Sequence, residues 1–387
     1  MNPVEIPLAV LTVFVSAKLM RELLERLGQP GIVGEILAGV LIGPRVLGWI
    51  HPNDILTALS ELGVIFLLFR IGLEVKPSDL LRVGGDAVAV AACGVTLSFA
   101  MGAGIALLWH LPPVEAMFIA TAMVATSVVI TAEVLSSRGL LAARASQVIL
   151  AAAVVDDVLG LIVLAVVSSL ARGPVNWVDL LLTAGVAGGF TLLMAVWGHR
   201  AARRFVPRMQ AGMRVVEAEF TLAMALLFGL SLLAVYAGVA AIIGAFFAGL
   251  ALSETVDTRV HTMTSGVSEF LVPFFLVGIG LRLDPSVFAD GSTLVLALVL
   301  LAAAIVAKLV GCGLGAFRLG RRDALRVGAG MAPRGEVGMV VAQLGRRMGV
   351  MPESVYAVII FLSIATTLAA PPMIRLAFRG EPRTGAS

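Results

Sequence analysis

Long apolar stretches alternate with short polar ones along nearly the whole chain. Thirteen such stretches are present, centred near residues 15, 40, 65, 96, 124, 158, 188, 225, 246, 275, 305, 334 and 364. Each spans about 17 to 28 residues, and a helix that rises ~1.5 Å per residue needs about 20 apolar residues to cross a bilayer. The pattern therefore predicts an all-α membrane protein with thirteen transmembrane helices.

Composition supports this prediction. Of the 387 residues, 59% are hydrophobic and 14% are charged, with a formal net charge of +3. Soluble domains average about 25% charged residues. The basic residues are spread between the apolar stretches and form no aromatic-interleaved patch, so nucleic acid is not an expected partner. The expected partner is the lipid bilayer, and nothing in the sequence indicates an obligate soluble partner.

The basic residues also predict the orientation of the chain. When the loops alternate sides from an external N-terminus, one side carries twenty lysines and arginines. The other side carries four, namely Arg172, Arg282, Arg346 and Arg347. Because cytoplasmic loops carry the excess of basic residues, we expect a multi-pass protein of the cell (inner) membrane, with the N-terminus outside and the C-terminus in the cytoplasm.

Two adjacent carboxylates, Asp156 and Asp157, interrupt the sixth apolar stretch. They lie ~15 Å beyond Ser146, near the middle of a hydrocarbon core ~30 Å thick. One Asp at a helix centre costs about 2.5 to 3.5 kcal/mol on insertion scales. Protonation or structural pairing between helices is the ordinary alternative, but ionisable residues at this depth typically mark ion and proton routes. The pair therefore predicts an ion and proton site.

The second half of the chain echoes the first. The segment EFLVPFFLVGIGLRLD at 269–284 matches ELGVIFLLFRIGLEV at 61–75 in its acidic start and its Gly-Leu-charged end. Stretches one to six and eight to thirteen form two six-helix units joined by a single helix, so the second unit enters the membrane inverted. An inverted repeat of this kind is the usual plan of secondary transporters.

Under this repeat the fifth stretch corresponds to the twelfth. The twelfth has Pro333 and several glycines at its middle, which predicts a broken helix, with Arg334 and Glu336 as structural support at the break. The fifth has hydroxyls at its centre, including Thr126 and Ser127, but neither glycine nor proline. Its residues alone therefore do not predict a break.

A lysine in the eleventh stretch shares the depth of the aspartates. Lys308 lies ~15 Å from Arg318 at the cytoplasmic end of that stretch. Because successive helical residues point about 100° apart, Asp156 and Asp157 cannot face Lys308 equally well. We expect one carboxylate to pair with the lysine and the other to face water and an ion.

Other ionisable residues receive structural assignments. Glu35 is expected in a first helical turn, stabilised by the helix dipole, and Arg70 is expected to pair with Glu74 one turn later. Both cysteines are expected to pack as small side chains, and the four histidines show no metal-ligand spacing. No nucleophile, phosphate loop or metal cluster indicates an enzyme, and no cofactor is expected.

Six segments in chain order read LGQPGIVGEILAGVLIGP, ELGVIFLLFRIGLE, ATSVVITAEVL, VVDDVLGLIVLAVV, AAIIGAFFAGLAL and GMAPRGEVGMVVAQLG. Together they resemble the monovalent cation:proton antiporter-2 family, specifically its bacterial electrogenic sodium/proton antiporters. The resemblance implies the sodium/proton antiporter fold, with two inverted six-helix repeats, discontinuous crossing helices and a homodimer. It implies scaffold or dimer helices at 1–83 and 212–285, core helices at 84–172 and 286–380, a linking helix at 173–211 and a cytoplasmic tail at 381–387.

The resemblance also implies residue roles. Asp157 would bind the cation and protons, with Na⁺ held at Asp157 and Asp156. Asp156 would form a salt bridge with Lys308 that breaks when the cation binds. Thr126 and Ser127 match the crossing of the broken helices, although some relatives carry an acid where Ser127 stands. Glu336 and Arg334 match supports of the broken helix.

The function that follows is exchange of Na⁺ or Li⁺ for H⁺ by alternating access. A K⁺/H⁺ antiporter is the nearest alternative, because the same family includes potassium exporters. A passive cation channel and a sodium-coupled symporter are further alternatives, because a fold does not settle function.

Overall fold

The computed structural model describes residues 5–27, 29, 31–172, 177–198, 200–201, 203–204, 218–282 and 290–381. Over these residues the chain forms helices and no strands. Eight helical segments are long and apolar enough to cross a membrane, and three shorter apolar helices accompany them. The prediction of an all-α membrane protein is confirmed. The predicted cytoplasmic tail lies outside the described residues beyond Glu381.

The helices are α1 Glu5–Arg26, α2 Gly31–Ile42, α3 Asp54–Glu74, α4 Pro77–Arg82, α5 Gly84–Leu108, α6 Pro113–Val124, α7 Val128–Ser136, α8 Arg144–Arg172, α9 Trp177–Leu193, η1 Met194–Gly198, α11 Ala218–Tyr236, α12 Ala241–Leu252, α13 Thr258–Gly280, α14 Gly291–Gly315, η3 Phe317–Leu319, α15 Arg321–Gly330, α16 Glu336–Arg347 and α17 Glu353–Ala377.

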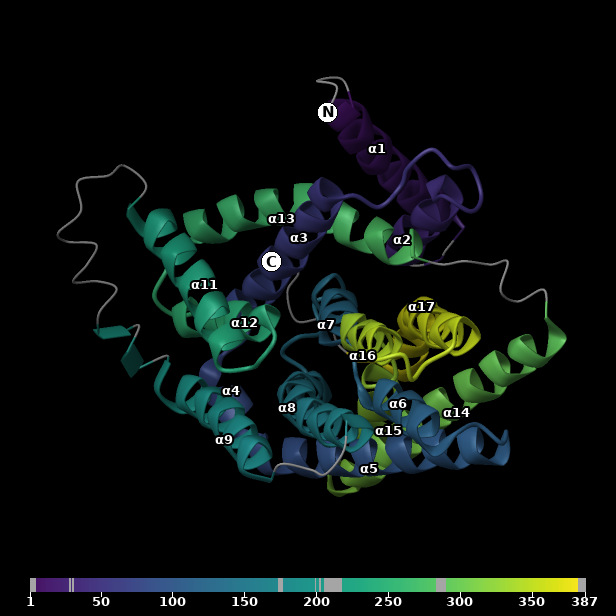
Figure 1. The fold of residues 1–387 in the computed structure, drawn as a ribbon. Coiled ribbons are helices and arrows are strands. Elements are labelled where there is room, and N and C mark those ends of the chain that lie inside the picture. Colours follow the sequence, from purple (N-terminus) through teal and green to yellow (C-terminus); the bar gives the residue numbers. More distant parts are fainter. Residues whose placement is uncertain are drawn as a thin grey trace.

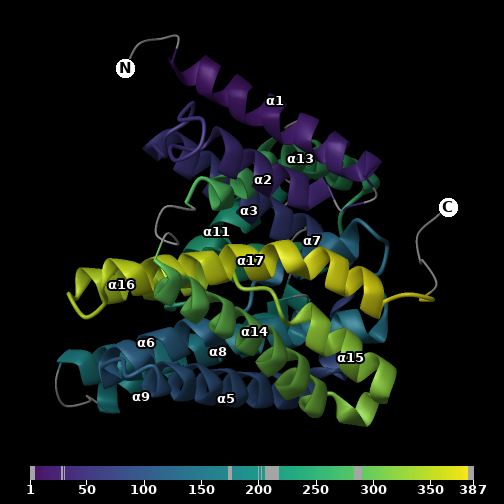
Figure 2. The same cartoon turned by 90° about the vertical axis from the view of Figure 1, so that its right-hand side faces the viewer.

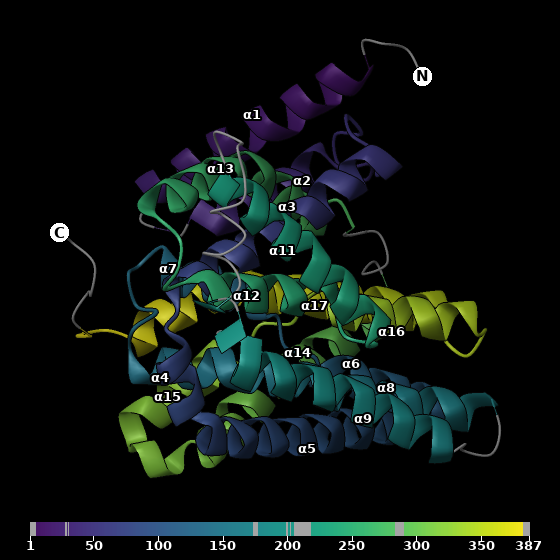
Figure 3. The same ribbon diagram turned by 90° about the vertical axis from the view of Figure 1, so that its left-hand side faces the viewer.

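The helices form two layers. In the first layer, α1 to α3 pack against α11 to α13. In the second layer, α5, α6 and α8 pack with α14 to α17 (Figure 1 and Figure 2). The α9 helix lies along α8, and η1, which follows it, contacts α12 of the first layer (Figure 3). Short α7 lies between the layers, where it contacts α3 on one side and α8 and α17 on the other.

Capping side chains fix where several helices begin. Asn53 Oδ1 accepts the amide of Leu56 at 2.9 Å, and Asp290 Oδ2 accepts the amide of Thr293 at 3.0 Å. Such caps satisfy amides that have no partner within the helix. The Thr293 hydroxyl, followed by the amides of Thr293 and Ser292, holds the pKa of the Asp290 carboxyl below its usual value.

Glycines allow helices of the first layer to cross at backbone contact. A Cβ atom at Gly39 of α2 would overlap the carbonyl oxygen of Val277 in α13. In the same way, a Cβ atom at Gly249 of α12 would overlap the carbonyl oxygen of Phe69 in α3. Close backbone packing of this kind drives helix association in membranes, where the hydrophobic effect between helices is absent.

This packing predicts the effect of a methyl group at Gly280 of α13, where a Cβ atom would overlap the carbonyl oxygen of Ile36. We expect Gly280→Ala to lower the free energy of unfolding by about 1 to 3 kcal/mol, the usual cost of overpacking. Thermal unfolding in detergent measures it. Gly266→Ala is the matched control in the same helix, because nothing lies within 4 Å of its Cβ position. Equal melting temperatures for the two variants would contradict the packing account.

Two predicted electrostatic assignments are wrong. Glu35 is the fifth residue of α2, is fully buried, and accepts a hydrogen bond from Arg21 Nη1 at 3.1 Å. Arg70 pairs with Glu133 on α7 instead of Glu74, with its Nη2 atom 2.7 Å from Glu133 Oε2. Glu74 instead accepts a hydrogen bond from Ser136. In both cases a partner on another helix replaces the local interaction.

Candidate ion and proton site

Two interrupted helices meet where α7 borders the second layer. The fifth apolar stretch is divided between α6, which ends at Val124, and α7, which begins at Val128. The twelfth is divided between α15, which ends at Gly330, and α16, which begins at Glu336. The break predicted from Pro333 is therefore confirmed, and the fifth stretch, whose residues alone did not predict a break, has one as well.

Contacts between the two breaks explain why the fifth stretch unwinds without glycine or proline. The Ser127 amide donates to the Pro333 carbonyl oxygen at 2.8 Å. The Thr131 hydroxyl donates to the Gly330 carbonyl oxygen at 2.6 Å. Non-helical backbone at membrane depth is tolerated where it is buried in protein and its polar groups find partners. Each break therefore supplies hydrogen-bonding partners to the other.

Lys308 and Asp156 form a buried ion pair beside this crossing. Lys308 Nζ on α14 lies 2.8 Å from Asp156 Oδ1 on α8, and both side chains are 0% exposed. Asp156 Oδ2 is buried and has no hydrogen-bond partner among the described residues. Asp157, the next residue of α8, is also buried. The structure thus brings together the three charged residues that the sequence analysis predicts at the same depth in the membrane.

A glycine in α5 allows close packing against α14 beside Lys308. A Cβ atom at Gly94 would overlap Cys312 Sγ and would lie 3.7 Å from Lys308 Nζ. Gly94 therefore lets α5 cover the lysine closely, a role that sequence reasoning missed. Both cysteines are free rather than joined in a disulfide; Cys312 is buried, as expected of a packed side chain, whereas Cys93 is exposed on α5.

Arg334 connects the crossing to the lysine helix and is fully buried. Its Nη1 donates to the carbonyl oxygen of Ala125 at 3.2 Å, and its Nη2 donates to that of Ala304 at 3.1 Å. Ala125 is the C-cap residue of α6, where the end of the helix dipole is negative. The positive guanidinium therefore compensates this partial charge. Ala304 lies one turn before Lys308. The arginine therefore ties the break in α6 and α7 to the turn that carries the lysine.

Two threonines of α17, which sequence reasoning missed, hold the backbone of Arg334. Its amide donates to Thr366 Oγ1 at 3.0 Å, and its carbonyl oxygen accepts from Thr367 Oγ1 at 2.7 Å. Their signal in the sequence was a pair of hydroxyls inside an otherwise apolar stretch. Glu336, the other predicted support, begins α16, and its side chain lies outside the described part of the structure.

The hydroxyls of Thr126 and Ser127 lie at the crossing. Thr126 Oγ1 is 3.5 Å from the Met331 carbonyl oxygen. Ser127 Oγ is buried without a hydrogen-bond partner among the described residues, and a Cβ atom at Gly335 would lie 2.5 Å from it. No group of three or more His, Cys, Asp or Glu side chains in the described ranges is arranged to hold a metal ion. The oxygen atoms near the crossing belong to the two carboxylates, to hydroxyls and to unwound backbone.

Two crossing, interrupted helices beside a buried charge pair are the architecture of a secondary transporter, in which broken helices line an ion site at the midplane. Comparison with known proteins of similar sequence supports this classification. A model of the family described as "Sodium/hydrogen exchanger, transmembrane" matches residues 10–380.

Two curated relatives cover nearly all of the chain. The chain is 34% identical over 379 residues to the Na⁺/H⁺-K⁺ antiporter GerN of Bacillus cereus, and the match covers 96% of each protein. It is 33% identical over 418 residues to the high-affinity Na⁺/H⁺ antiporter NhaS3 of Synechocystis, covering 97% of this chain and 90% of the relative.

A solved structure shares the fold. The sodium proton antiporter MjNhaP1 from Methanocaldococcus jannaschii matches with a TM-score of 0.66 at 20% identity, over 96% of this chain and 98% of that one. This chain belongs to the sodium/hydrogen exchanger family of cation/proton antiporters, and it is a multi-pass membrane transporter rather than an enzyme.

Proposed function

We propose that this protein exchanges Na⁺ or Li⁺ for H⁺ across the cell membrane by alternating access. The observation that carries the proposal is the fully buried pair of Lys308 and Asp156, 2.8 Å apart, directly next to Asp157. Charges at this depth are costly and are typical of ion and proton pathways. In this proposal Asp157 binds the cation or a proton, and Asp156 exchanges its partner between Lys308 and the cation.

The proposed cycle is a competition for the same carboxylates. Without a cation, Lys308 neutralises Asp156 and Asp157 carries a proton. An entering Na⁺ takes oxygen atoms from both aspartates, with Thr126 and Ser127 at the crossing as neighbouring polar groups, and the salt bridge opens. Asp157 and Lys308 each release a proton, so one Na⁺ exchanges for two protons and one net charge moves. The membrane potential then contributes about 2.3 kcal/mol per 100 mV to each cycle.

The proposal includes thirteen crossings arranged as two inverted repeats. The same glycine contact occurs in both halves, which supports the repeat. A Cβ atom at Gly34 of α2 would overlap the carbonyl oxygen of Met20 in α1, and one at Gly244 of α12 would overlap that of Leu230 in α11. The contact of α2 with α13 likewise mirrors that of α12 with α3.

The layers suggest how the parts move. We propose that the first layer, residues 1–83 and 212–285, is the scaffold of a homodimer. The second layer, residues 84–172 and 286–380, would be the mobile core, and 173–211 would link them. The excess of basic residues on one side supports an external N-terminus and a cytoplasmic C-terminus.

One observation favours K⁺ as an additional or alternative substrate. The relative GerN, which is 34% identical to this chain, is named as a Na⁺/H⁺-K⁺ antiporter. The site geometry is compatible with either ion, because carboxylate, hydroxyl and carbonyl oxygens can surround both. The cation is therefore decided by transport measurements.

Purified protein in liposomes tests the proposal directly. With a pH gradient imposed and a lumenal pH dye, Na⁺ or Li⁺ is expected to collapse the gradient, whereas Asp157→Asn should be silent. Glu353→Gln, an exposed position on α17, is the control and should transport normally. Collapse by K⁺ alone would change the substrate. Full activity of Asp157→Asn would overturn the proposed site, and no response to any of the three ions would overturn antiport.

A further inference from the structure

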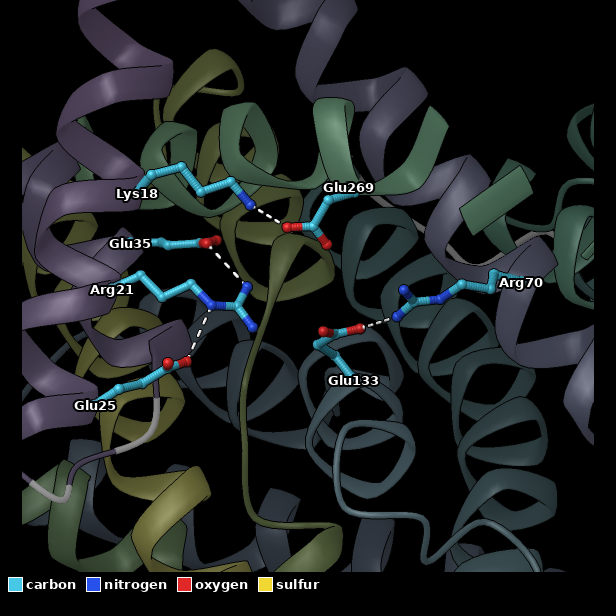
Figure 4. A network of polar contacts seen from close by, with 7 residues as sticks. All are labelled: Lys18, Arg21, Glu25, Glu35, Arg70, Glu133 and Glu269. Atoms are coloured by element: carbon cyan, nitrogen blue, oxygen red, sulfur yellow. Dashed lines mark hydrogen bonds and ion pairs between the residues drawn. The ribbon is translucent and has the colours of Figure 1, made fainter. Parts of the chain in front are cut away.

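A second group of charged side chains lies apart from the Lys308 site, on α1, α2, α3, α7 and α13 (Figure 4). Within the first layer, Lys18 pairs with Glu269 and Arg21 pairs with Glu35. One pair has a different character, because it joins the two layers. Arg70 on α3 of the first layer contacts Glu133 on α7, which packs with α8 and α17 of the second.

The link between α3 and α7 consists of two polar contacts. Arg70 Nη2 lies 2.7 Å from Glu133 Oε2, with side-chain exposures of 18% and 10%. About one turn further along both helices, Ser136 Oγ donates to Glu74 Oε2 at 3.0 Å. The two contacts fix the end of α7 that is distant from the helix crossing.

The other end of α7 belongs to the crossing itself. Ser127, which precedes the helix, donates its amide to Pro333, and Thr131 donates to the Gly330 carbonyl oxygen. The helix has nine residues and is therefore only ~13 Å long. Because so short a helix moves as a rigid unit, displacement of its Glu133 end also displaces Ser127.

The energetics of the pair suit a contact that opens and closes. The desolvation cost of burying two charges offsets much of their mutual attraction. Opening the ion pair therefore costs little net free energy when both groups become hydrated. Arg70 Nε is buried and has no hydrogen-bond partner among the described residues, so the closed state does not satisfy the guanidinium fully. Another contact between the layers, from Arg282 Nη1 to Met339 Sδ, is a weak N–H···S interaction at 3.5 Å.

From these contacts we infer that Arg70 and Glu133 are positioning residues that form a latch between the layers, assisted by Glu74 and Ser136. The latch holds α7 against α3 on the side that the basic residues assign to the cytoplasm. Its opening lets the second layer move and admits a cytoplasmic cation to the crossing. This inference rests on the proposed antiport and orientation. In that cycle, opening of the latch is the step that opens the cytoplasmic entrance.

Hydrogen–deuterium exchange on the full-length protein in detergent tests the latch without requiring transport. In Arg70→Gln and in Glu133→Gln, amides of residues 128–136 are expected to exchange at least tenfold faster, while those of α5 stay unchanged. The charge-swapped double variant R70E/E133R should restore slow exchange. Lys18→Gln is the control, because its pair with Glu269 lies within the first layer. Ser136→Ala removes only the hydrogen bond to Glu74 and leaves the ion pair, so a smaller increase confined to α7 is expected.

Transport provides the second reading. In liposomes of known orientation, both single charge variants should lower the apparent KM for Na⁺ on the cytoplasmic side at least threefold and leave the external KM unchanged. Unchanged exchange in α7, or an equal increase throughout the protein without rescue by the charge swap, would overturn the latch. If the wild-type protein shows no antiport, the proposed function fails, while the exchange data still decide whether the contact holds α7.

Discussion

Replacing Asp156 with Asn is expected to lower the free energy of unfolding by about 3 to 5 kcal/mol, because it leaves Lys308 buried without its charged partner. Both side chains are 0% exposed, so water cannot replace the lost contact. Thermal unfolding in detergent, followed by tryptophan fluorescence, measures the change. The double variant Asp156→Asn with Lys308→Gln should recover most of the loss, because it removes both charges together.

An exposed pair of the same length provides the comparison for this prediction. Arg346 Nη2 and Glu353 Oε2 are also 2.8 Å apart, but their side chains are 51% and 68% exposed. Exposed pairs typically contribute about 0 to 1 kcal/mol, so Glu353→Gln should hardly change the melting temperature. Similar losses of unfolding free energy in Asp156→Asn and Glu353→Gln would contradict the prediction that burial makes the first pair more costly to break. The absence of recovery in the double variant would contradict it as well.

The sequence predicted those parts of the site that depend on depth and on backbone chemistry. Asp156, Asp157 and Lys308 could be placed at one level because helical rise converts residue counts into distance. The break at Pro333 was predictable because proline lacks an amide hydrogen and clashes within a helix. These signals are local, so they can be read without knowledge of the neighbouring helices.

The features that sequence reasoning missed all depend on contacts between distant segments. The break after Val124 is stabilised by partners on α15 and on the loop before α16, roughly two hundred residues further along the chain. Arg70 was assigned to Glu74, which is close in sequence, but α7 brings Glu133 to it from 63 residues away. Gly94 carried no signal, because the tight approach it permits appears only once α5 and α14 are packed.

Arg334 is the residue for which we expect the largest combined effect on stability and transport. Arg334→Met removes the donors to Ala125 and Ala304 and leaves the C-terminal end of α6 without its compensating charge. Loss of packing and of hydrogen bonds at a fully buried position is expected to cost about 2 to 5 kcal/mol. Ala304 lies one turn before Lys308, so loss of this contact should displace the lysine. Na⁺-dependent collapse of a pH gradient in liposomes should then slow by about tenfold or more, because small misplacements of reacting groups have large effects on rate.

Two further variants separate the role of Arg334 from a general loss of positive charge. Arg334→Lys keeps the charge but cannot reach both carbonyl oxygens with a planar fork, so it should fall between the wild type and Arg334→Met in both measurements. Arg322→Ala removes an exposed arginine from α15, the helix that precedes the break, and should change stability by about 0.5 kcal/mol or less. If Arg334→Lys behaves like the wild type, the charge alone supports the crossing. If it fails as completely as Arg334→Met, the two carbonyl contacts are what hold α6 and the lysine helix in register.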